Sequence, residues 1–528
     1  MRALSALPRC SCRAKRVTGC CSSTPAPVSA QQPTTVELQC TSLAFGGRGV
    51  CRGDDGKVAF VPFALPGERL TARITARKAR YDEAEHVATL SPSPDATEPR
   101  CPHFRDCGGC SLQHMTLQAQ LEAKAGHVRD ALRRVGGFRD ADVKVLPPVP
   151  AHKPWRYRNK VEFTFASSGS DRPPQLGLLR QGRSLAMDGD AALVEVGSCI
   201  LQHSEADAVL ATARALLAKH HPGALSAPGV LRRLMIRTSD GGEASGVSVQ
   251  VDILTAMDLS PEASAALENL ANSLADAHPA VVSVVNSRLP GGDIDEMDDG
   301  GSRDAAPQTR RPQTRAAPVQ QAVKTHLLHG APQLGMRLGG TTFEVSSRSF
   351  FQVSAQAEQL LVAVAEAAEL TGTERVLDLF CGCGAMSLPL ATRMGSLLGI
   401  DVTPEAVGDA QKAAKAAGLD GKATFRVGDL STLDSLTGRR GEGAPQGPDV
   451  VIVDPARAGL SSPLVSWLRG CGAKRLVYVS CNPATQARDL QALCGTDGKG
   501  AKFVLQWVLP VELFPHTGHV ETVACMTR

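Results

Sequence analysis

Cys481 stands at a position in the sequence that is suited to covalent chemistry. It follows the apolar run RLVYVS (475–480), where a buried strand is expected, and it precedes a turn with Pro483. A thiol at such an exposed strand end can act as a nucleophile, and nearby helix N-termini would lower its pKa. A cysteine with apolar neighbours is more often inert packing, but the strand stops at Ser480, which weakens that interpretation.

A carboxylate beside two histidines is the second chemical candidate. Glu521 lies in the segment FPHTGHVETV, close to His516 and His519. A carboxylate can serve as a general base where a reaction requires removal of a proton. The two histidines could also ligate a metal, but they lie in a loop after Pro515, and this is the weaker interpretation.

Polar residues end several further apolar runs. The runs, separated by helical or flexible segments, are RVLDLF (375–380), SLLGID (396–401), ATFRVGD (423–429) and DVVIVD (449–454). This alternation predicts an α/β domain with a doubly wound parallel sheet. Ligands of such sheets bind beyond the carboxyl ends of the strands. The aspartates expected there, each of which alone could be a turn former, are Asp378, Asp401, Asp429 and Asp454.

A pair of glycines follows the first of these strands. Gly382 and Gly384 allow a tight turn and a close approach of the backbone to a ligand. The third glycine of a dinucleotide fingerprint is missing, because Ser387 stands in its place. Asp401, at the end of the next strand, is suited to bind ribose hydroxyls. NAD and S-adenosylmethionine both fit this pattern, and the incomplete fingerprint favours S-adenosylmethionine.

Three of the 16 cysteines form a cluster in the sequence. Cys101, Cys107 and Cys110 have the spacing C-x5-C-x2-C within CPHFRDCGGC. The cysteines as a whole do not form the dense framework of a small secreted domain, so we expect reduced thiols with a specific role. The spacing alone is compatible with zinc, with an iron–sulfur cluster and with a purely structural group of thiols.

Composition excludes two broad classes of protein. Of the 528 residues, 43% are hydrophobic and 21% are charged, so the chain is not wholly disordered. It contains no apolar run of about 18 residues, which argues against a membrane span. The formal net charge is +4, but without the five basic residues that precede Glu37 the chain has 52 basic against 53 acidic residues. Binding to nucleic acid would therefore depend on local basic patches.

A leader and three domains are expected. Residues 1–34 contain no acid and no secretory core, and they predict an organellar transit peptide, with the chloroplast favoured over the mitochondrion and a tail without an address as the alternative. Residues 35–93 predict a small OB-type β-barrel. Residues 94–345 predict a mixed α+β domain with a helix at Leu117–Val135 and a disordered insertion at 290–325. Residues 346–528 are expected to form the α/β domain.

A cationic and aromatic segment, KPWRYRNK (153–160), lies in the central domain. Cations such as Arg156, Arg158 and Lys160 can position phosphates, while aromatic rings stack on unpaired bases. An ordinary strand with a solvated face is the alternative. A second group of cations, a plausible RNA surface on the barrel, consists of Arg48, Arg52, Arg73, Arg77, Lys78 and Arg80.

Several motifs together resemble the RNA uridine-5 methyltransferases of the bacterial rRNA type, which carry a TRAM domain and an iron–sulfur cluster. The motifs are CPHFRDCGGCSLQH, RYRNKVEFTF, SRSFFQVSAQAE, VLDLFCGCG, VIVDPARAGL, VYVSCNPATQARDL and FPHTGHVETV. The resemblance runs from about residue 36 to 528, apart from 290–325 and the Gly-rich 437–447 loop. It implies a class I S-adenosylmethionine-dependent catalytic domain after a TRAM barrel and a central domain with a 4Fe–4S cluster.

The resemblance also implies roles for individual residues. Cys481 is the expected nucleophile, Glu521 is the expected base, and Asp454 is expected to hold the uracil edge. Gln352, Phe380, Asp401 and Asp429 match the family's cofactor contacts, and the glycine turn and strand-end pattern add Gly382, Gly384 and Asp454 as expected contacts. The expected cluster ligands are Cys101, Cys107, Cys110 and, in VGSCILQ, Cys199.

Uracil explains why such an enzyme needs both a thiol and a carboxylate. Carbon 5 of the neutral ring is a poor nucleophile, whereas addition of a thiolate at carbon 6 makes an enolate that can attack a methyl sulfonium. A base then removes the carbon 5 proton, and the target base must leave its stack to reach the site. Two positions depart from the family pattern: Ala385 replaces a polar residue common there, and Asp401 replaces a longer glutamate.

We therefore expect a monomeric enzyme, not bound to a membrane, that forms 5-methyluridine in RNA, with rRNA favoured. One alternative is uridine-5 methylation of tRNA. Another is an amino-group methyltransferase, whose chemistry would not need Cys481 or Glu521. A third is a non-catalytic iron–sulfur RNA-binding or assembly factor with a vestigial methyltransferase fold.

Overall fold

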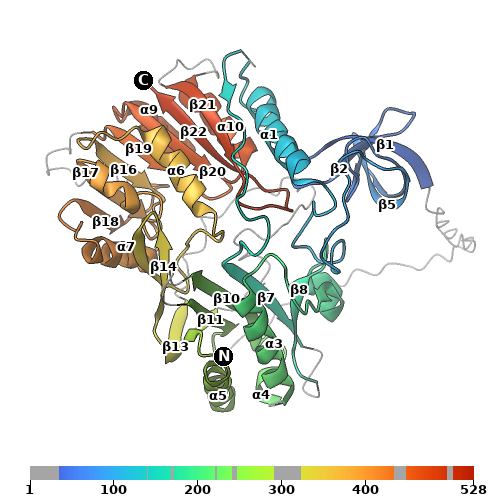
Figure 1. Cartoon of the computed structure of the whole chain (residues 1–528), viewed down its shortest axis with the longest axis vertical. Coiled ribbons are helices and arrows are strands. Elements are labelled where there is room, and N and C mark those ends of the chain that lie inside the picture. The colour runs from blue at the N-terminus through green and yellow to red at the C-terminus, as the bar shows by residue number, and fades with distance from the viewer. Residues whose placement is uncertain are drawn as a thin grey trace, which may run out of the picture.

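The structure is a computed structural model that describes residues 35–139, 141–167, 172–219, 223–240, 246–289, 323–432, 447–495 and 503–528. Figure 1 shows a barrel (blue), a central domain (green) and a larger α/β domain (yellow to red). The leader predicted at 1–34 and residues 290–322 of the predicted insertion lie outside the described residues. None of the helices in the described ranges is long and apolar enough to cross a membrane.

The N-terminal barrel predicted for residues 35–93 is confirmed. Its strands close in the order β1-β2-β3-β5-β4. Side chains alternate across the strands, so residues such as Leu38, Cys40 and Leu70 fill the interior while their neighbours in sequence face outward. The strands are β1 (Thr35–Leu43), β2 (Gly49–Arg52), β3 (Val58–Val61), β4 (Arg69–Arg77) and β5 (Tyr81–Ser91).

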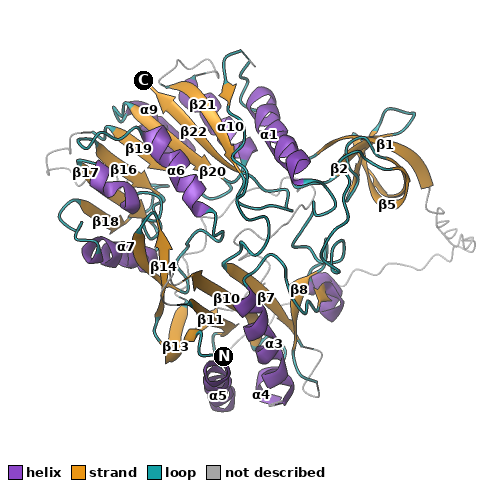
Figure 2. Ribbon diagram, in the orientation of Figure 1, coloured by secondary structure: helices purple, strands orange, loops and turns teal. Residues whose placement is uncertain are grey.

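The central domain is the predicted mixture of helices and strands. It has a seven-stranded sheet of order β13-β12-β11-β10-β7-β8-β9, and α3 and α5 share an apolar core with it (Figure 2). Its strands are β7 (Lys160–Ala166), β8 (Gln175–Leu179), β9 (Leu193–Val194), β10 (Leu231–Asp240), β11 (Val247–Ala256), β12 (Val281–Leu289) and β13 (Lys324–Gly330). Its helices are α2 (Leu185–Asp188), α3 (Ser204–Lys219), α4 (Gly223–Ser226) and α5 (Pro261–Ala277).

The predicted end of the insertion at residue 325 is wrong. Lys324 and Thr325 already belong to β13, where they pair with Arg288 and Ser287 of β12. Their polar character suggested an unstructured segment, but the hydrogen bonds of an edge strand do not require apolar side chains.

The α/β domain contains an eight-stranded sheet of order β18-β17-β16-β19-β20-β22-β21-β6. Helices α6 and α7 pack on one face, and α1, α9 and α10 pack on the other, as a doubly wound fold requires. The strands are β16 (Arg375–Leu379), β17 (Ser396–Asp401), β18 (Ala423–Val427), β19 (Val450–Val453), β20 (Arg475–Ser480), β21 (Val504–Val511) and β22 (Glu521–Thr527). The helices are α6 (Ala357–Ala368), α7 (Pro404–Ala416), α9 (Ser462–Gly470) and α10 (Pro483–Cys494).

This sheet is not entirely parallel, in contrast to the prediction. β16 to β20 are parallel, but β22 runs antiparallel to both of its neighbours, β20 and β21. The reason is the connection: the loop 512–520 joins β21 and β22 as a hairpin, whereas a parallel arrangement would need a crossover to carry the chain back to the starting edge of the sheet. We call residues 512–520 the β21–β22 loop.

Two segments that the prediction placed in the central domain belong to the α/β domain. α1 (Leu117–Arg134) confirms the predicted helix, and its Val128 and Leu132 join the core formed with α10 (Figure 1). β6 (Lys144–Val145) extends the sheet by pairing with Trp507 and Val508 of β21. An amphipathic helix and a two-residue strand carry no sequence signal for the domain on which they pack.

The predicted boundary at residue 346 is also too late. β14 (Gln333–Leu338) and β15 (Thr341–Ser346) form a hairpin of their own, and Phe343 and Val345 are buried in one core with Leu360 of α6. The alternating pattern of the hairpin identifies strands, but only packing reveals that they belong to the α/β domain.

A buried ion pair fixes α1 to the β21–β22 loop. Lys124 Nζ lies 2.6 Å from Glu512 Oε2 and donates a second hydrogen bond to the Phe514 carbonyl at 3.1 Å. Both side chains are almost completely buried. Loss of one partner would therefore leave the other charge desolvated and unpaired.

Lys124→Met should lower the free energy of unfolding by about 3–5 kcal/mol, because Glu512 would keep its burial and lose its cation. Chemical denaturation followed by circular dichroism measures the change. Arg133→Ala is the matched control on the same helix: its ion pair with Asp130 is half exposed, and its loss should cost about 0–1 kcal/mol. Equal effects of the two substitutions would contradict a stabilising role of the buried pair.

Candidate active site

Sheet pairing places Cys481 and Glu521 side by side. Ser480 pairs with Thr522 across β20 and β22, so the next residues of the two strands, Cys481 and Glu521, stand opposite each other at the edge of the sheet. Thr522 Oγ1 donates a hydrogen bond to the Ser480 carbonyl at 2.9 Å and locks this register. The thiol and the carboxylate are close enough for Glu521 to raise the pKa of Cys481.

Asp454 and Arg457 complete the charged surroundings of the thiol. Asp454 directly follows β19, the neighbour of β20, and desolvation raises its pKa to about 7. Burial also raises the pKa of Glu521 well above its usual value; Asp454 adds to the rise and Arg457 opposes it. The site therefore holds two carboxyl groups that favour the protonated state more than ordinary carboxyl groups do.

The surroundings of the Cys481 thiol favour its protonated form. Burial raises its pKa to about 12; Glu521 contributes further to the rise, and Arg457 opposes it. This differs from the expectation that helix N-termini would lower the pKa. The partial burial of the thiol in an acidic pocket outweighs the effect of the N-terminus of α10, which begins at Pro483.

A pocket adjoins this group at the carboxyl ends of the strands. Its lining residues are Phe350, Gln352, Asp378, Phe380, Cys381, Gly382, Cys383, Ala385, Met386 and Asp454. Gln352, Phe380, Gly382 and Asp454, all expected cofactor contacts, are among them. Asp454 thus belongs both to this pocket and to the surroundings of Cys481, so a ligand here would lie beside the thiol.

The chain after β16 has the tight conformation that its glycines predict. Gly382 and Gly384 have φ of 53° and 80°, and even Phe380 is left-handed at 66°. A Cβ on Gly384 would come within 3.0 Å of the Phe425 ring, so a larger residue would meet both backbone strain and crowding. Asp378 accepts a hydrogen bond from Ser387, and burial raises its pKa to about 7.

Asp401 and Asp429 stand apart from the pocket lining. Asp401 accepts hydrogen bonds from the backbone N–H groups of Gly382, at 3.0 Å, and Thr403, at 2.8 Å, so it fixes the glycine turn to the end of β17. Asp429 is exposed and accepts a bond from the Ser431 N–H at 2.8 Å. The structure thus places Asp401 at the rim of the pocket and does not bring Asp429 into its lining.

The β21–β22 loop, which leads to Glu521, is held from several sides. The His516 carbonyl accepts hydrogen bonds from the N–H groups of Ser111 and Leu112, at 3.1 and 3.0 Å, and its N–H donates to Gln120 Oε1 at 2.8 Å. The Trp155 ring stacks on His516 at 3.7 Å. Because Ser111 and Leu112 follow Cys110, the cysteine segment directly supports this loop.

The four cysteines expected to ligate a cluster lie near one another. Cys107 interacts electrostatically with Cys101 and Cys199, and Cys110 interacts with Cys199 and Cys107. Two sulfurs accept hydrogen bonds: Cys107 from the Gly109 N–H at 3.4 Å and Cys110 from Gln113 Nε2 at 3.1 Å. Across the described ranges, however, no group of three or more His, Cys, Asp or Glu side chains is placed to hold a metal ion, and this includes His516 and His519.

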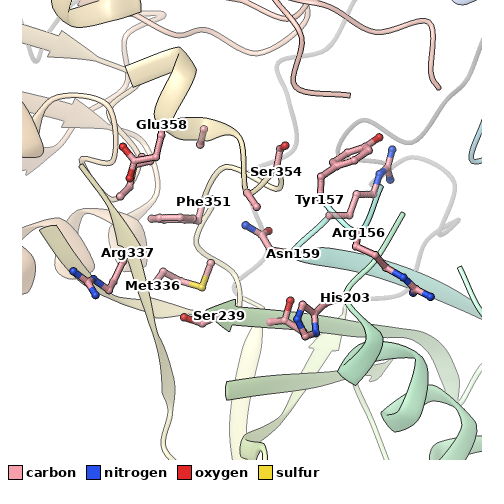
Figure 3. Close-up of a pocket in the computed structure, with 15 residues that line it drawn as sticks. Arg156, Tyr157, Asn159, His203, Ser239, Met336, Arg337, Phe351, Ser354 and Glu358 are labelled. Atoms are coloured by element: carbon pink, nitrogen blue, oxygen red, sulfur yellow. The ribbon is translucent and has the colours of Figure 1, made fainter. Parts of the chain in front are cut away.

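The predicted RNA-binding cations are only partly brought together. Arg156 and Arg158 line a separate cleft, in which Arg337 and Glu358 come from the opposite side (Figure 3). Arg156 is also paired with Asp207 and bonded to the Cys199 carbonyl at 3.0 Å. Lys160 lies outside the lining and pairs with Glu162 at 2.8 Å.

Sequence reasoning missed Arg457 and the role of Trp155. Arg457 acts on the pKa of both Cys481 and Glu521, and the only signal for it was its place three residues after Asp454 in DPARAGL. Trp155 belonged to the segment proposed to stack on RNA bases, but its ring is stacked on His516, with the Arg100 guanidinium 5.0 Å from its centre. The effect of Arg457 on Cys481 and Glu521 and the stacking of Trp155 on His516 both join residues that are far apart in the chain.

The strand order of this sheet and the pocket at the carboxyl ends of its strands are those of the α/β fold of methyltransferases. The crystal structure of Pyrococcus abyssi tRNA (uracil-54, C5)-methyltransferase in complex with S-adenosyl-L-homocysteine matches with a TM-score of 0.64, covering 93% of this chain and 99% of that one at 23% identity. A family model described as tRNA (Uracil-5-)-methyltransferase matches residues 333–528, and a TRAM domain model matches residues 31–87. The first match begins at the β14–β15 hairpin.

Relatives match over almost the whole chain. A protein named "Uncharacterized RNA methyltransferase" from Nitratidesulfovibrio vulgaris is 34% identical over 499 residues, which are 94% of this chain and 96% of that protein. One with the same name from Porphyromonas gingivalis is 33% identical over 93% of this chain and 99% of its own length. The chain belongs to this family of RNA methyltransferases with a TRAM domain and a tRNA (uracil-5-)-methyltransferase domain.

Alkylation of Cys481 by iodoacetamide should accelerate about tenfold per pH unit between about pH 7 and about pH 9, because only the thiolate reacts and the pKa of about 12 lies above this range. Mass spectrometry of the peptide that contains Cys481 measures the rate, and Cys481→Ser identifies the peptide. Arg457→Gln should slow the reaction, since Arg457 lowers this pKa. A rate that levels off near pH 8 would contradict the raised pKa.

Proposed function

We propose that the protein transfers a methyl group from S-adenosylmethionine to carbon 5 of uridine in RNA through a covalent adduct with Cys481. The observation that carries the proposal is the pairing of β20 with β22, which sets Cys481 opposite Glu521 beside a pocket that shares Asp454 with them. Amino-group methylation would use neither Cys481 nor Glu521. A non-catalytic RNA-binding factor would not need the two groups in this arrangement.

The pocket fits the proposed methyl donor. It lies at the carboxyl ends of the parallel strands, where such folds bind their ligands, and the glycine turn lets the backbone approach a ligand closely. Gln352, Phe380 and Asp378 would contact the donor, with Asp401 holding the turn in place. When bound, S-adenosylmethionine supplies an electrophilic methyl group on its sulfonium.

The chain's own residues perform the remaining steps. The Cys481 thiol releases its proton to solvent and its sulfur forms a bond to carbon 6 of the uracil, while the electron pair of the 5,6 double bond moves to the enolate. Carbon 5 then forms a bond to the methyl group, whose bond to the sulfonium breaks and leaves a neutral thioether. Glu521 then accepts the carbon 5 proton, the double bond re-forms, and the carbon–sulfur bond breaks to return the thiolate. Arg457 favours the thiolate, and the raised pKa of Glu521 makes its carboxylate a better proton acceptor than an ordinary one.

Cys481→Ala should abolish both methylation and the covalent RNA adduct while leaving binding of the methyl donor intact, because the thiol lies outside the pocket lining. Glu521→Gln should let the adduct form and then accumulate, since its proton is no longer removed. Incorporation of a labelled methyl group and denaturing gels of enzyme–RNA mixtures measure the two effects. Methylation by Cys481→Ala, or normal turnover by Glu521→Gln, would contradict the respective role.

We also propose that Cys101, Cys107, Cys110 and Cys199 hold a 4Fe–4S cluster. The hydrogen bonds to two of the sulfurs and the nearby Arg158 guanidinium suit an anionic cluster with thiolate ligands. Thiolates also bind Zn²⁺, so the metal and sulfide content of the protein distinguishes the cluster from zinc.

Protein purified without oxygen should contain iron and acid-labile sulfide in a ratio near one, with the visible absorption of an iron–sulfur cluster. Cys199→Ala should lose both, because the fourth ligand comes from this distant segment, whereas Cys494→Ala, which changes a thiol in α10, should retain them. Zinc without sulfide, or an iron content unaffected by Cys199→Ala, would contradict the assignment.

For the substrate we propose ribosomal RNA, with tRNA as the alternative. The resemblance of the barrel and the four-cysteine group to the rRNA branch of the family supports rRNA, whereas the solved structure that matches 93% of this chain is named as a tRNA methyltransferase and supports the alternative. The composition of residues 1–34 supports delivery to an organelle, with the chloroplast favoured over the mitochondrion. Comparison of 5-methyluridine in organellar rRNA and tRNA, with and without the gene, distinguishes the two RNA substrates.

A further inference from the structure

Two aromatic side chains stand out because they are exposed. Among the large hydrophobic residues in the described ranges that are more than about a third exposed, only Phe45 (40%) and Phe350 (59%) are aromatic. Phe350 lines the proposed donor pocket. Phe45 lies in the turn 44–48 between β1 and β2 of the barrel, and it has no role in the proposed mechanism.

The turn that carries Phe45 is packed directly on the β21–β22 loop. A Cβ on Gly518 would come within 2.3 Å of the Gly46 carbonyl carbon, so the two backbones touch with no room for a side chain. The Phe45 ring meets His519 edge-to-face, with ring centres 6.5 Å apart. His519 lies two residues before Glu521, so the barrel turn reaches the neighbourhood of the catalytic carboxylate.

The turn is also held in a fixed conformation. Ala44 N–H donates to the Arg48 carbonyl at 2.8 Å, and Gly46 and Gly47 take φ of 94° and 99°, which only glycine adopts readily. On its other side the Phe45 ring meets His127 of α1 edge-to-face, at 6.1 Å between centres, and His127 Nε2 lies 2.9 Å from the Leu43 carbonyl. Phe45 is therefore anchored on a rigid support.

The chemistry of this position suits a nucleic-acid base. Both histidine contacts are edge-to-face, so neither ring covers Phe45 by parallel stacking, and 40% of the residue remains exposed. Burial lowers the pKa of His519 to about 3, which keeps this neighbour an uncharged aromatic ring. An exposed aromatic ring on a rigid turn is the feature with which proteins stack on unpaired bases of RNA.

We propose that Phe45 is an RNA-binding residue that stacks on an unpaired base next to the flipped-out target uridine. The inference rests on the proposed function for the identity of the target, but the binding of RNA by Phe45 can be measured without methylation. In the alternative, Phe45 merely packs the barrel against the β21–β22 loop. That alternative predicts loss of stability without a specific loss of RNA affinity.

The test compares Phe45→Ala, Phe45→Trp and the control Leu90→Ala, using the full chain. Leu90 is 48% exposed on β5 of the same barrel, outside the turn 44–48. Fluorescence anisotropy with a labelled single-stranded oligouridine, in the absence of the methyl donor, measures the RNA affinity. Phe45→Ala should weaken binding roughly 5- to 150-fold, the range that ~1–3 kcal/mol per stacked base gives, while Phe45→Trp and Leu90→Ala bind like the wild type.

A second readout separates stacking from packing. In Phe45→Trp the emission of the new indole should be quenched when the oligouridine binds, beyond the change that the three native tryptophans give in the wild type. Equal RNA affinity of Phe45→Ala and wild type would overturn the inference, as would an affinity loss matched by an equal loss in Leu90→Ala. If Phe45→Ala loses affinity but the wild type methylates no uridine, the RNA contact stands and the proposed function fails.

Discussion

The antiparallel pairing of β22 with β20 is the constraint on which the site depends. In an all-parallel sheet every strand would send its carboxyl end to the same edge, and a residue at the start of a strand would lie at the far side. Because β22 runs in the opposite direction, its first residue, Glu521, lies at the edge where β20 ends at Ser480 and Cys481 follows. The Cys481 thiol and the Glu521 carboxylate therefore meet without any special loop geometry.

The β21–β22 loop explains how three domains contribute to one site. The barrel touches it at Gly518, α1 binds it through Lys124 and Gln120, and the cysteine segment donates two backbone hydrogen bonds to His516. These contacts are largely buried and polar, so each group depends on its partner for hydrogen bonds that water no longer supplies. A change in any of the three domains can thus reach the residues that precede Glu521.

Sequence reasoning identified much of the fold because its signals are local. The apolar runs became β16 to β20, and the polar residues after them gathered at one edge, since parallel strands impose that result. The reversal of β22, the addition of β6 and the placement of the β14–β15 hairpin were missed, because pairing partners far apart in the chain leave no periodic signal. The high pKa of Cys481 was missed for the same reason: it depends on burial and on Glu521, which only the folded sheet supplies.

The position of β22 in the sheet also bears on how the domain assembles. β22 follows β21 along the chain, yet it lies between β20 and β21, while β21 takes β6 from a much earlier segment as its other neighbour. During synthesis one edge of β20 must therefore stay unpaired until β22 emerges. Premature pairing of β20 with β21 would occupy the position in the sheet that β22 takes. Non-local pairing of this kind slows folding and leaves an unpaired strand edge on the nascent chain until the last strand has been made.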